Sequence, residues 1–249
     1  MNLNTSSTST SSSYDAKRGK VKDYFDVTAA DTWAKLTSDA PVSKIRATVR
    51  AGRDSMRATL LSWLPNDLSG IRLLDAGCGT GALALEAAKR GAHVVAVDLS
   101  PTLVNLARER LPAELHAGQV RNATNGCVEF HAGDLLDTKL GQFDFVVSMD
   151  CLIHYNAADA VDVLSKLAQR TSRAMLFTYA PSSPALMAMW SIGKMFPRKD
   201  RSPAIEPVKE SDLKTRFQNN SELCQWQIGR TQRIKSGFYT SQALELKKS

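Results

Sequence analysis

The chain has 249 residues and a formal net charge of +7. Hydrophobic residues make up 43% of it and charged residues 23%, which is typical of a globular protein and excludes fibrous and wholly disordered classes. No apolar run approaches the ~20 residues that cross a bilayer, and the N-terminus lacks the features of a signal peptide. We therefore expect a cytoplasmic protein. The positive charge favours an anionic partner without choosing among nucleic acid, lipid and small acids.

The residues that most often bind metal ions or form disulfides are scattered along the chain. No CxxC spacing is present among the cysteines, and the histidines outside one later motif lack the spacing of metal ligands. We expect no metal bound by the protein and a reducing compartment. These residues are Cys78, Cys127, Cys151, Cys224, His93, His116 and His131.

The first sixty residues change character twice. Residues 2–13 (NLNTSSTSTSSS) have no apolar side chains to offset the entropy of ordering, so we expect a disordered tail over residues 1–18. Residues 19–66 predict a helical arm that is interrupted near Pro41. Within this arm, apolar residues recur at helix spacing and arginines follow a separate stripe. The apolar residues are Ile45, Val49, Met56 and Leu60, and the arginines are Arg46, Arg50, Arg53 and Arg57.

The remainder, residues 67–249, alternates strand-like and helical segments. Such alternation predicts a mostly parallel α/β sheet with helices on both faces. Two further strand-like runs joined near Ser236 and Gly237 predict an antiparallel hairpin at one sheet edge. The first five predicted strands are IRLLDAG (71–77), HVVAVDLS (93–100), VEFHAGD (128–134), FDFVVSMD (143–150) and AMLFTYAP (174–181).

Capping signals mark three helices. Ser100 before Pro101 predicts a helix start, and Asn156 with Asp159 predicts another. Gly91 is expected to end the helix over residues 82–90. Residues 184–208 form a methionine-rich, basic insertion that could cover an apolar ligand as a lid, although such a stripe more often belongs to a core.

A glycine-rich turn, LLDAGCGTGA, follows the first predicted strand and opens a helix. Gly77, Gly79 and Gly81 lie where the backbone can approach a ligand closely. The pattern is weak by itself, because it also fits the looser dinucleotide fingerprint. Asp75 argues against a dinucleotide, since a carboxylate directly before the glycines repels a pyrophosphate and attracts an ammonium or sulfonium group.

Two more aspartates follow the next two predicted strands. Asp98 lies 23 residues after Asp75 and can accept hydrogen bonds from both hydroxyls of a ribose. Asp134 is placed to reach an adenine amino group. Each aspartate alone is equally consistent with a helix cap or a turn residue. Three in this order, after successive strands, are much more specific.

At these residues the sequence resembles the class I S-adenosylmethionine-dependent methyltransferases, over roughly Ile71 to Ala180. The resemblance implies a Rossmann-like sheet and S-adenosylmethionine as the methyl donor. The residues implied to bind the donor are Asp75, Gly77, Gly79, Gly81, Asp98, Leu99, Asp134, Leu135 and Met149.

A narrower resemblance, to the magnesium-protoporphyrin IX O-methyltransferases, rests on motifs spread from Asp23 to Glu245. It implies methyl transfer to a propionate of magnesium-protoporphyrin IX, giving the 13-monomethyl ester in bacteriochlorophyll biosynthesis. One departure is Thr37, which stands where members from oxygenic phototrophs have a tyrosine linked to catalysis. The motifs are DYFDVTAADTWAKL, IRATVRAGR, DCLIHY, FTYAP and GFYTSQALE.

The resemblance also implies roles for individual residues. His154 is implied to contribute to catalysis, as a base or as a group that orients the acceptor, against the alternative of a histidine satisfied within the core. Arg50 is implied to bind a carboxylate of the substrate or of the donor, against the alternative of a solvated helix face. Tyr24, Tyr155 and Tyr239 are the candidates to replace the missing tyrosine in substrate binding.

Other functions remain open from the residues alone. A quinone precursor is the alternative small-molecule acceptor, and an NAD-dependent oxidoreductase is a minor one. Nucleic acid binding is disfavoured, because residues 43–57 contain no aromatic side chain to stack on bases. A magnesium chelatase large subunit that hands over substrate, and peripheral contact of the basic insertion with photosynthetic membranes, are further expectations.

Overall fold

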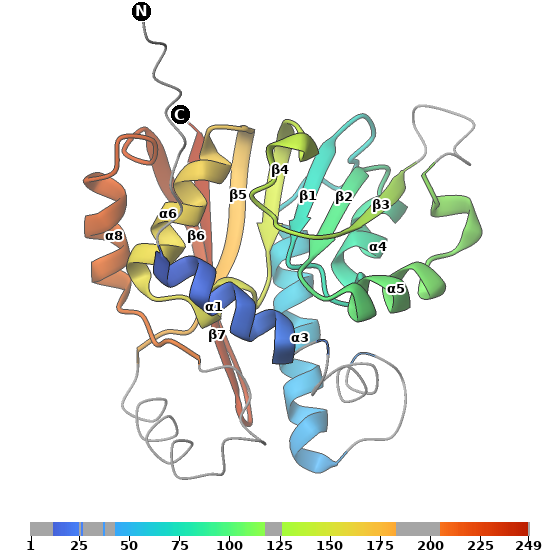
Figure 1. Ribbon diagram of the computed structural model, residues 1–249, viewed down its shortest axis with the longest axis horizontal. Coiled ribbons are helices and arrows are strands. Elements are labelled where there is room, and N and C mark those ends of the chain that lie inside the picture. Colours follow the sequence, from blue (N-terminus) through green and yellow to red (C-terminus); the bar gives the residue numbers. More distant parts are fainter. Residues whose placement is uncertain are drawn as a thin grey trace, which may run out of the picture.

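The computed structural model describes residues 12–24, 26, 37, 43–117, 126–182 and 205–248. In these residues a seven-stranded sheet carries helices on both faces (Figure 1). The strands are β1 (Arg72–Ala76), β2 (His93–Asp98), β3 (Cys127–Ala132), β4 (Phe143–Ser148), β5 (Thr171–Tyr179), β6 (Trp226–Ser236) and β7 (Tyr239–Lys248). The helices are α1 (Ser12–Asp23), α3 (Lys44–Ser62), α4 (Ala82–Lys89), α5 (Pro101–Arg110), α6 (Ala157–Ala168) and α8 (Glu210–Gln218), with short 3-10 turns η2 (Ala113–Leu115), η3 (Thr138–Leu140) and η4 (Leu152–His154).

The strand order is β3-β2-β1-β4-β5-β7-β6. The pairings among β1 to β5 are parallel, and β7 runs antiparallel to both β5 and β6. This confirms the predicted mostly parallel sheet with a C-terminal hairpin at its edge. Because β1 lies between β2 and β4, the chain order reverses there, and open α/β sheets bind ligands at the carboxyl ends of strands beside such a reversal.

Two apolar layers cover the sheet. The layer under α6 and α8 buries Leu164 and Phe217 against Phe177, and Tyr14 of α1 belongs to it. The layer under α3, α4 and α5 buries residues such as Met56 and others from β1, β2 and β4. Since the central strands are buried on both faces, they consist of almost continuous apolar runs, as strands of parallel sheets do.

The predicted caps of α5 and α6 are present. Ser100 Oγ accepts a hydrogen bond from the Leu103 amide at 3.2 Å, and Asn156 Oδ1 accepts one from the Asp159 amide at 2.9 Å. The α4 helix ends at Lys89, and Gly91 adopts a φ of 99° two residues later. Helix α8 had no prediction, because its polar sequence ESDLKTRFQ offers few apolar positions to identify a buried face.

The predicted boundary of the N-terminal tail is wrong. Residues 12–18 belong to α1 rather than to a disordered segment, and the Tyr14 side chain is only 2% exposed. Its ring stacks on Tyr155, with 5.2 Å between ring centroids. Burial of this aromatic side chain contributes to offsetting the ordering entropy of the segment, together with the ion pairs of Lys17 with Glu206 and of Arg18 with Asp134. Residues 1–11, most of the arm over 27–42, and 183–204 of the insertion lie outside the described residues.

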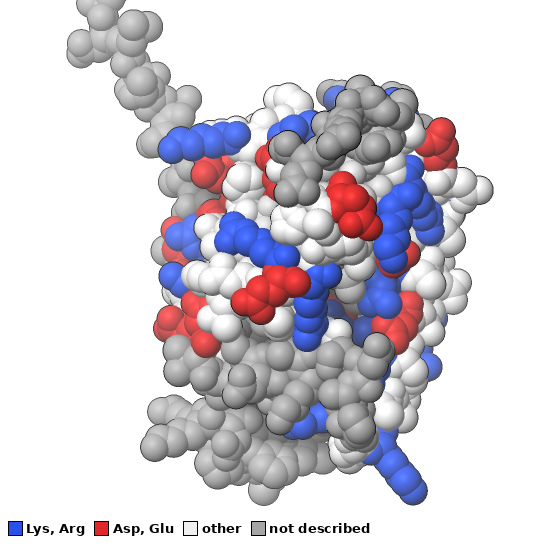
Figure 2. Space-filling model, turned by 90° about the vertical axis from the view of Figure 1, so that its right-hand side faces the viewer, with Lys and Arg blue, Asp and Glu red and all other residues white. Residues whose placement is uncertain are grey.

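Charge is dispersed over the described surface that Figure 2 shows, where basic and acidic side chains alternate and no band of one sign runs across the face. A continuous basic track, as nucleic-acid-binding proteins have, is not seen on this face. None of the helices in the described ranges is long and apolar enough to cross a membrane.

The C-terminal hairpin is anchored by a buried carboxylate. Glu245 is 1% exposed, and its Oε2 accepts hydrogen bonds from the Arg230 backbone amide and Nε at 2.9 and 2.8 Å. Arg230 also donates to the Trp63 carbonyl at 2.7 Å and lies over the Trp63 ring, which ties the hairpin to the end of α3. Burial works to raise the pKa of Glu245, but the hydrogen bonds from Arg230 outweigh it and lower that pKa.

Replacing Glu245 with glutamine is expected to lower the free energy of unfolding at pH 7 by about 2 kcal/mol, because the amide keeps the volume but removes the charge that pairs with Arg230. A carboxylate whose pKa is lowered by folding stabilises above its unfolded pKa of about 4.3 and loses that effect as the pH falls. Urea unfolding should therefore show the difference in the free energy of unfolding shrinking below pH ~4.

The control is Glu86→Gln, at an exposed partner of Lys89, which should change the free energy of unfolding little. An equal loss of stability in both variants would contradict the anchoring role.

Candidate active site at the carboxyl edge of the sheet

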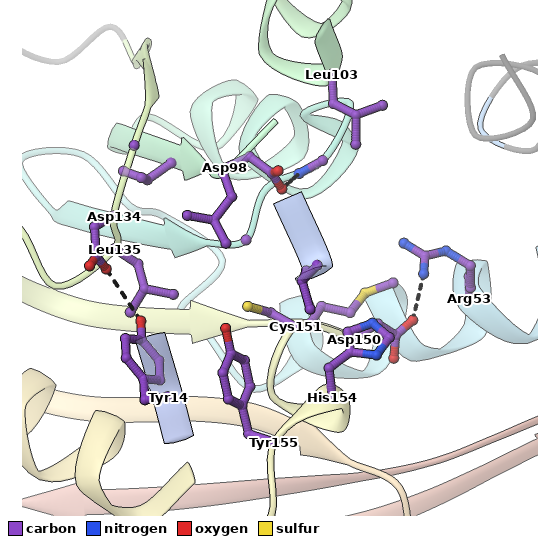
Figure 3. Close-up of a pocket in the computed structure, with 17 residues that line it drawn as sticks. Tyr14, Arg53, Asp98, Leu103, Asp134, Leu135, Asp150, Cys151, His154 and Tyr155 are labelled. Carbon is purple, nitrogen blue, oxygen red and sulfur yellow. Dashed lines mark hydrogen bonds and ion pairs between the residues drawn. The ribbon is translucent and has the colours of Figure 1, made fainter. Parts of the chain in front are cut away.

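Two adjoining cavities open at the carboxyl ends of the central strands. The main cavity is lined by α1, by the loops that follow β1 to β4, and by η4, as Figure 3 shows for its labelled residues. The second, here called the arginine cavity, lies between α3 and the start of α4 and is lined by Arg50, Arg53 and Arg57 among others. Gly77 and Gly79 line both cavities, so the glycine-rich turn lies at the boundary between them.

The glycine-rich turn is built from left-handed backbone. Gly77 has a φ of 85°, and a Cβ added there would lie 2.5 Å from the Cβ of Cys151. Its amide donates to the Val97 carbonyl at 2.8 Å, which fixes the turn on β2. Gly81, a predicted donor-binding residue, lines neither cavity; a Cβ there would meet the Phe130 ring at 2.7 Å. Gly81 therefore allows α4 to pack closely on the sheet.

Asp75, near the end of β1, is the least solvated acid of the site. The residue is 2% exposed, and its Oδ2 atom has no hydrogen-bond partner among the described residues. Burial, and then the charge of Asp98, raise the pKa of Asp75 to about 7. Because Asp75 also lines the arginine cavity, this oxygen is available to a cationic ligand.

Asp98, at the end of β2, organises the glycine turn. Its Oδ2 accepts a hydrogen bond from the Gly79 amide at 2.8 Å, and its Oδ1 accepts one from the Ser100 amide at 2.9 Å. Burial raises the pKa of Asp98, and these backbone hydrogen bonds oppose the rise. Asp98 lines the main cavity together with Leu99, as a residue that accepts from ribose hydroxyls must.

Asp134 lies after β3, where it meets α1. Its Oδ1 accepts from the Leu136 amide at 2.9 Å and from the Tyr14 hydroxyl at 3.3 Å, and Arg18 forms an ion pair with Oδ2. Asp134, for which the sequence predicts a contact to an adenine amino group, lines the main cavity, as does Leu135. Since a carboxylate offers about four lone-pair sites, an adenine amino group can share it with α1.

His154, in η4, lines the main cavity and is 8% exposed. Cys151 and Tyr155 from the same DCLIHY segment line it too, as does Met149. Burial, followed by the charge of Asp98, raises the pKa of Cys151 to about 12, and burial also raises the pKa of Tyr155. The thiol and the phenol therefore remain neutral at physiological pH, so neither supplies a strong base.

The other residues predicted to bind the substrate do not lie together in one cavity. Arg50 lines the arginine cavity, as does Thr37, whose hydroxyl accepts from Arg110 at 3.0 Å. Tyr24 is half-buried, and Tyr24 and Tyr239 are outside the linings of both cavities. Tyr239 reaches the main cavity indirectly, through a hydrogen bond from its hydroxyl to Asp150 at 3.0 Å.

Eight lining residues were not among the predicted site residues. Four of them carry polar or reactive side chains, namely Tyr14, Arg53, Asp150 and Cys151, and the others are Val21, Val97, Leu103 and Gly133. In α1, Tyr14, Arg18 and Val21 recur at helical spacing and therefore share one face. This pattern is present in the sequence, but the neighbouring serines favoured the interpretation of a polar tail. Asp150 and Cys151 stood inside the quoted DCLIHY motif. Across the described ranges, no group of three or more histidine, cysteine or acidic side chains is arranged to hold a metal ion.

Comparison with known proteins agrees with this geometry. The family described as magnesium-protoporphyrin IX methyltransferase C-terminus matches residues 148–248, and a methyltransferase domain matches residues 73–173. Magnesium-protoporphyrin O-methyltransferase of Rhodobacter capsulatus is 49% identical over 235 residues, which cover 94% of this chain and 98% of that protein. The crystal structure of magnesium protoporphyrin IX methyltransferase from Synechocystis PCC 6803 with bound SAH is 30% identical, with a TM-score of 0.76, and the match covers 93% of this chain and all of that one.

The ubiquinone biosynthesis O-methyltransferase of Acinetobacter baylyi is 29% identical over 130 residues, which cover only 52% of this chain and 49% of that protein.

Together, the sheet order, the glycine turn and the three acids at strand ends define a class I S-adenosylmethionine-dependent methyltransferase. Within that class, the chain belongs to the magnesium-protoporphyrin O-methyltransferase family. Both resemblances drawn from the motifs are confirmed.

The pKa of Asp75 gives donor binding a pH dependence. A cationic donor favours the ionised carboxylate, so affinity is expected to fall as the pH drops below about 7 and binding near pH 7 should release protons. Calorimetry in buffers of different ionisation enthalpy measures both effects. In Asp75→Asn this pH dependence should be lost and affinity at pH 8 should fall at least tenfold.

The same substitution should affect the stability of the free protein in the opposite direction. Because folding raises the pKa of Asp75, the native state loses stability between pH ~4 and ~7, and Asp75→Asn removes that cost. We expect a higher melting temperature than wild type at pH 8. Asp162→Asn, at a surface pair with Lys166, is the control. Unchanged donor affinity in Asp75→Asn would contradict the assignment.

Proposed function

We propose that this chain transfers the methyl group of S-adenosylmethionine to a propionate carboxylate of magnesium-protoporphyrin IX and gives the 13-monomethyl ester. The observation that carries the proposal is the buried Asp75 oxygen without a partner, beside a glycine turn held by Asp98, in a chain of this family. A carboxylate oxygen attacks the methyl carbon in line with the sulfur. The new O–CH3 bond forms while the S–CH3 bond breaks, its electron pair stays on sulfur, and no proton moves.

The residues of the main cavity suit an acceptor that is already ionised. A propionate has a pKa of about 4.3 and needs no general base at neutral pH. Burial keeps the thiol of Cys151 and the phenol of Tyr155 neutral, so both add uncharged groups to the lining of the cavity. Attack of an anion on a cation neutralises both charges, so a cavity less polar than water favours the transition state.

The roles that follow for individual residues are binding and orientation. We assign Asp98 and Leu99 to the ribose and Asp134 and Leu135 to the adenine, because all four line the main cavity. We assign Arg50 to the carboxylate of the donor's methionine part, because it lines the arginine cavity together with Asp75. His154 orients the acceptor through a hydrogen bond, and Tyr155 excludes water beside it.

The first test is incubation of the purified chain with S-adenosylmethionine and magnesium-protoporphyrin IX, followed by detection of a methyl ester. A quinone precursor is the comparison acceptor, since a phenol at neutral pH requires a base. We expect turnover with the porphyrin and little with the phenol; the reverse result would support the quinone reaction.

Replacing His154 with glutamine distinguishes orientation from base catalysis. For a carboxylate acceptor we expect a loss in kcat of about 10- to 100-fold, because one orienting hydrogen bond is worth roughly 1.5–3 kcal/mol at a charged group. The loss should be the same at pH 6.5 and pH 8.5, where a propionate is ionised throughout. A loss above 10³-fold, with a pH profile that changes shape, would instead indicate a general base.

Location and partners extend the proposal. A cytoplasmic enzyme at the surface of photosynthetic membranes, supplied by a magnesium chelatase large subunit, is consistent with the net charge of +7 and an apolar substrate. Flotation with anionic vesicles, and co-purification with that subunit, test the two associations separately.

A further inference from the structure

Asp150 has the most constrained backbone of the main cavity. It follows β4 with a φ of 54°, which makes it the one non-glycine residue with positive φ in the described part of the chain. Aspartate adopts this left-handed conformation more readily than most residues, yet the conformation is still unfavourable for a residue with a Cβ. Such strain persists only where surrounding contacts impose it, and it is concentrated at functional sites. The Asp150 side chain is 4% exposed.

Contacts from three elements hold the Asp150 carboxylate. Tyr239 of β7 donates its hydroxyl at 3.0 Å, and Ser241 of β7 lies 3.3 Å away. Thr178 of β5 accepts from the Asp150 amide at 2.7 Å, and its hydroxyl lies 3.3 Å from Oδ1. From α3, Arg53 Nη1 donates to Oδ2 at 2.8 Å. The carboxylate therefore joins the wall of the cavity to the helix that carries the arginines.

Arg53 has a distinctive position among the cations. It lines both cavities, whereas Arg50 and Arg57 line only the arginine cavity. Among the described residues that line the main cavity, no other lysine or arginine is present. Figure 3 shows its guanidinium directed at Asp150, on the side of the cavity where His154 lies.

We propose that Arg53 binds the acceptor carboxylate and that Asp150 is the positioning residue that holds its guanidinium for that contact. The inference rests on the proposed function and names the acceptor subsite. Arginine carries five N–H donors in a fixed fork, so a bond to Asp150 is compatible with bonds to a second carboxylate. One acceptor oxygen is held in this way while the other attacks the methyl group.

The pairing with Asp150 has a catalytic consequence. The acceptor loses its negative charge in the transition state, so an unpaired cation would stabilise the bound substrate more than the transition state. Asp150 offsets the charge of Arg53 and leaves directed N–H donors, which orient the acceptor with a smaller loss of its nucleophilicity. Asp150 lies two residues before Leu152, the first residue of η4, which also contains His154. The contact between Asp150 and Arg53 therefore also fixes the position of Arg53 relative to His154.

The test compares Arg53→Gln, Arg53→Lys and Asp150→Asn with Arg46→Gln, an exposed arginine on the same helix, as control. Steady-state kinetics give kcat and KM for each substrate, calorimetry gives the donor Kd, and fluorescence quenching gives binding of magnesium-protoporphyrin IX alone. For Arg53→Gln we expect kcat/KM for the porphyrin to fall 10- to 100-fold, weaker porphyrin binding, and a donor Kd within twofold of wild type. Arg53→Lys should recover part of the loss.

Asp150→Asn should lower kcat more than it raises the porphyrin KM, because Arg53 stays but loses its alignment. The double variant with Arg53→Gln should be no worse than Arg53→Gln alone, since coupled residues are not additive. If Asp150→Asn fails to fold, the two Arg53 variants decide the question.

Three outcomes would overturn the inference. A tenfold weaker donor Kd in Arg53→Gln, with an unchanged porphyrin KM, would assign Arg53 to the donor. Unchanged kinetics in both Arg53 variants, with only a lower melting temperature, would make the pair purely structural. Additive losses would separate the two residues. Failure of the proposed function differs from all of these, because wild-type protein would then form no methyl ester.

Discussion

The burial of a carboxylate with one unpaired oxygen near the end of the central strand is the constraint on which this site depends. Asp75 lies in β1, between β2 and β4, and is only 2% exposed. Its pKa near 7 reflects a cost that a folded protein ordinarily avoids. A cationic ligand offsets that cost and a phosphate increases it.

The glycine turn and Asp98 form one unit around this carboxylate. Asp98 receives the amide of Gly79 and that of Ser100, so a single side chain links the turn after β1 to the start of α5. The absence of a Cβ at Gly77 lets Cys151 pack against the turn. As a result, the glycine turn and the DCLIHY segment are in direct contact, and the residues proposed to bind the donor also position those proposed to meet the acceptor.

The acceptor side is assembled differently, from elements distant in sequence. Asp150 gathers α3, β5 and β7 around one carboxylate, and Glu245 ties the hairpin to the end of α3 through Arg230 and Trp63. The hairpin and α3 therefore behave as one support. The outer strand of the hairpin is largely exposed, whereas its inner strand supplies Tyr239 and Ser241, which hold Asp150 at the wall of the main cavity.

The sequence alone determined most of the sheet and the donor half of the site. Buried strands and capped helices are local patterns, and Asp75, Asp98 and Asp134 are readable because each lies at or just after the end of its own strand, in the order of a known motif. The order β3-β2-β1-β4-β5-β7-β6 places those strand ends together. Periodicity alone did not identify α8, whose two buried apolar residues are too few to show a face.

Only the tertiary structure decided the acceptor half. The order in α1 depends on Tyr14 stacking against Tyr155, and the role of Arg53 depends on Asp150, 97 residues away. In a helix with four arginines, spacing shows that they share a face but does not show which one reaches the cavity. That choice depends on a long-range contact between charged groups, and local sequence patterns carry no information about which charges meet in the folded chain.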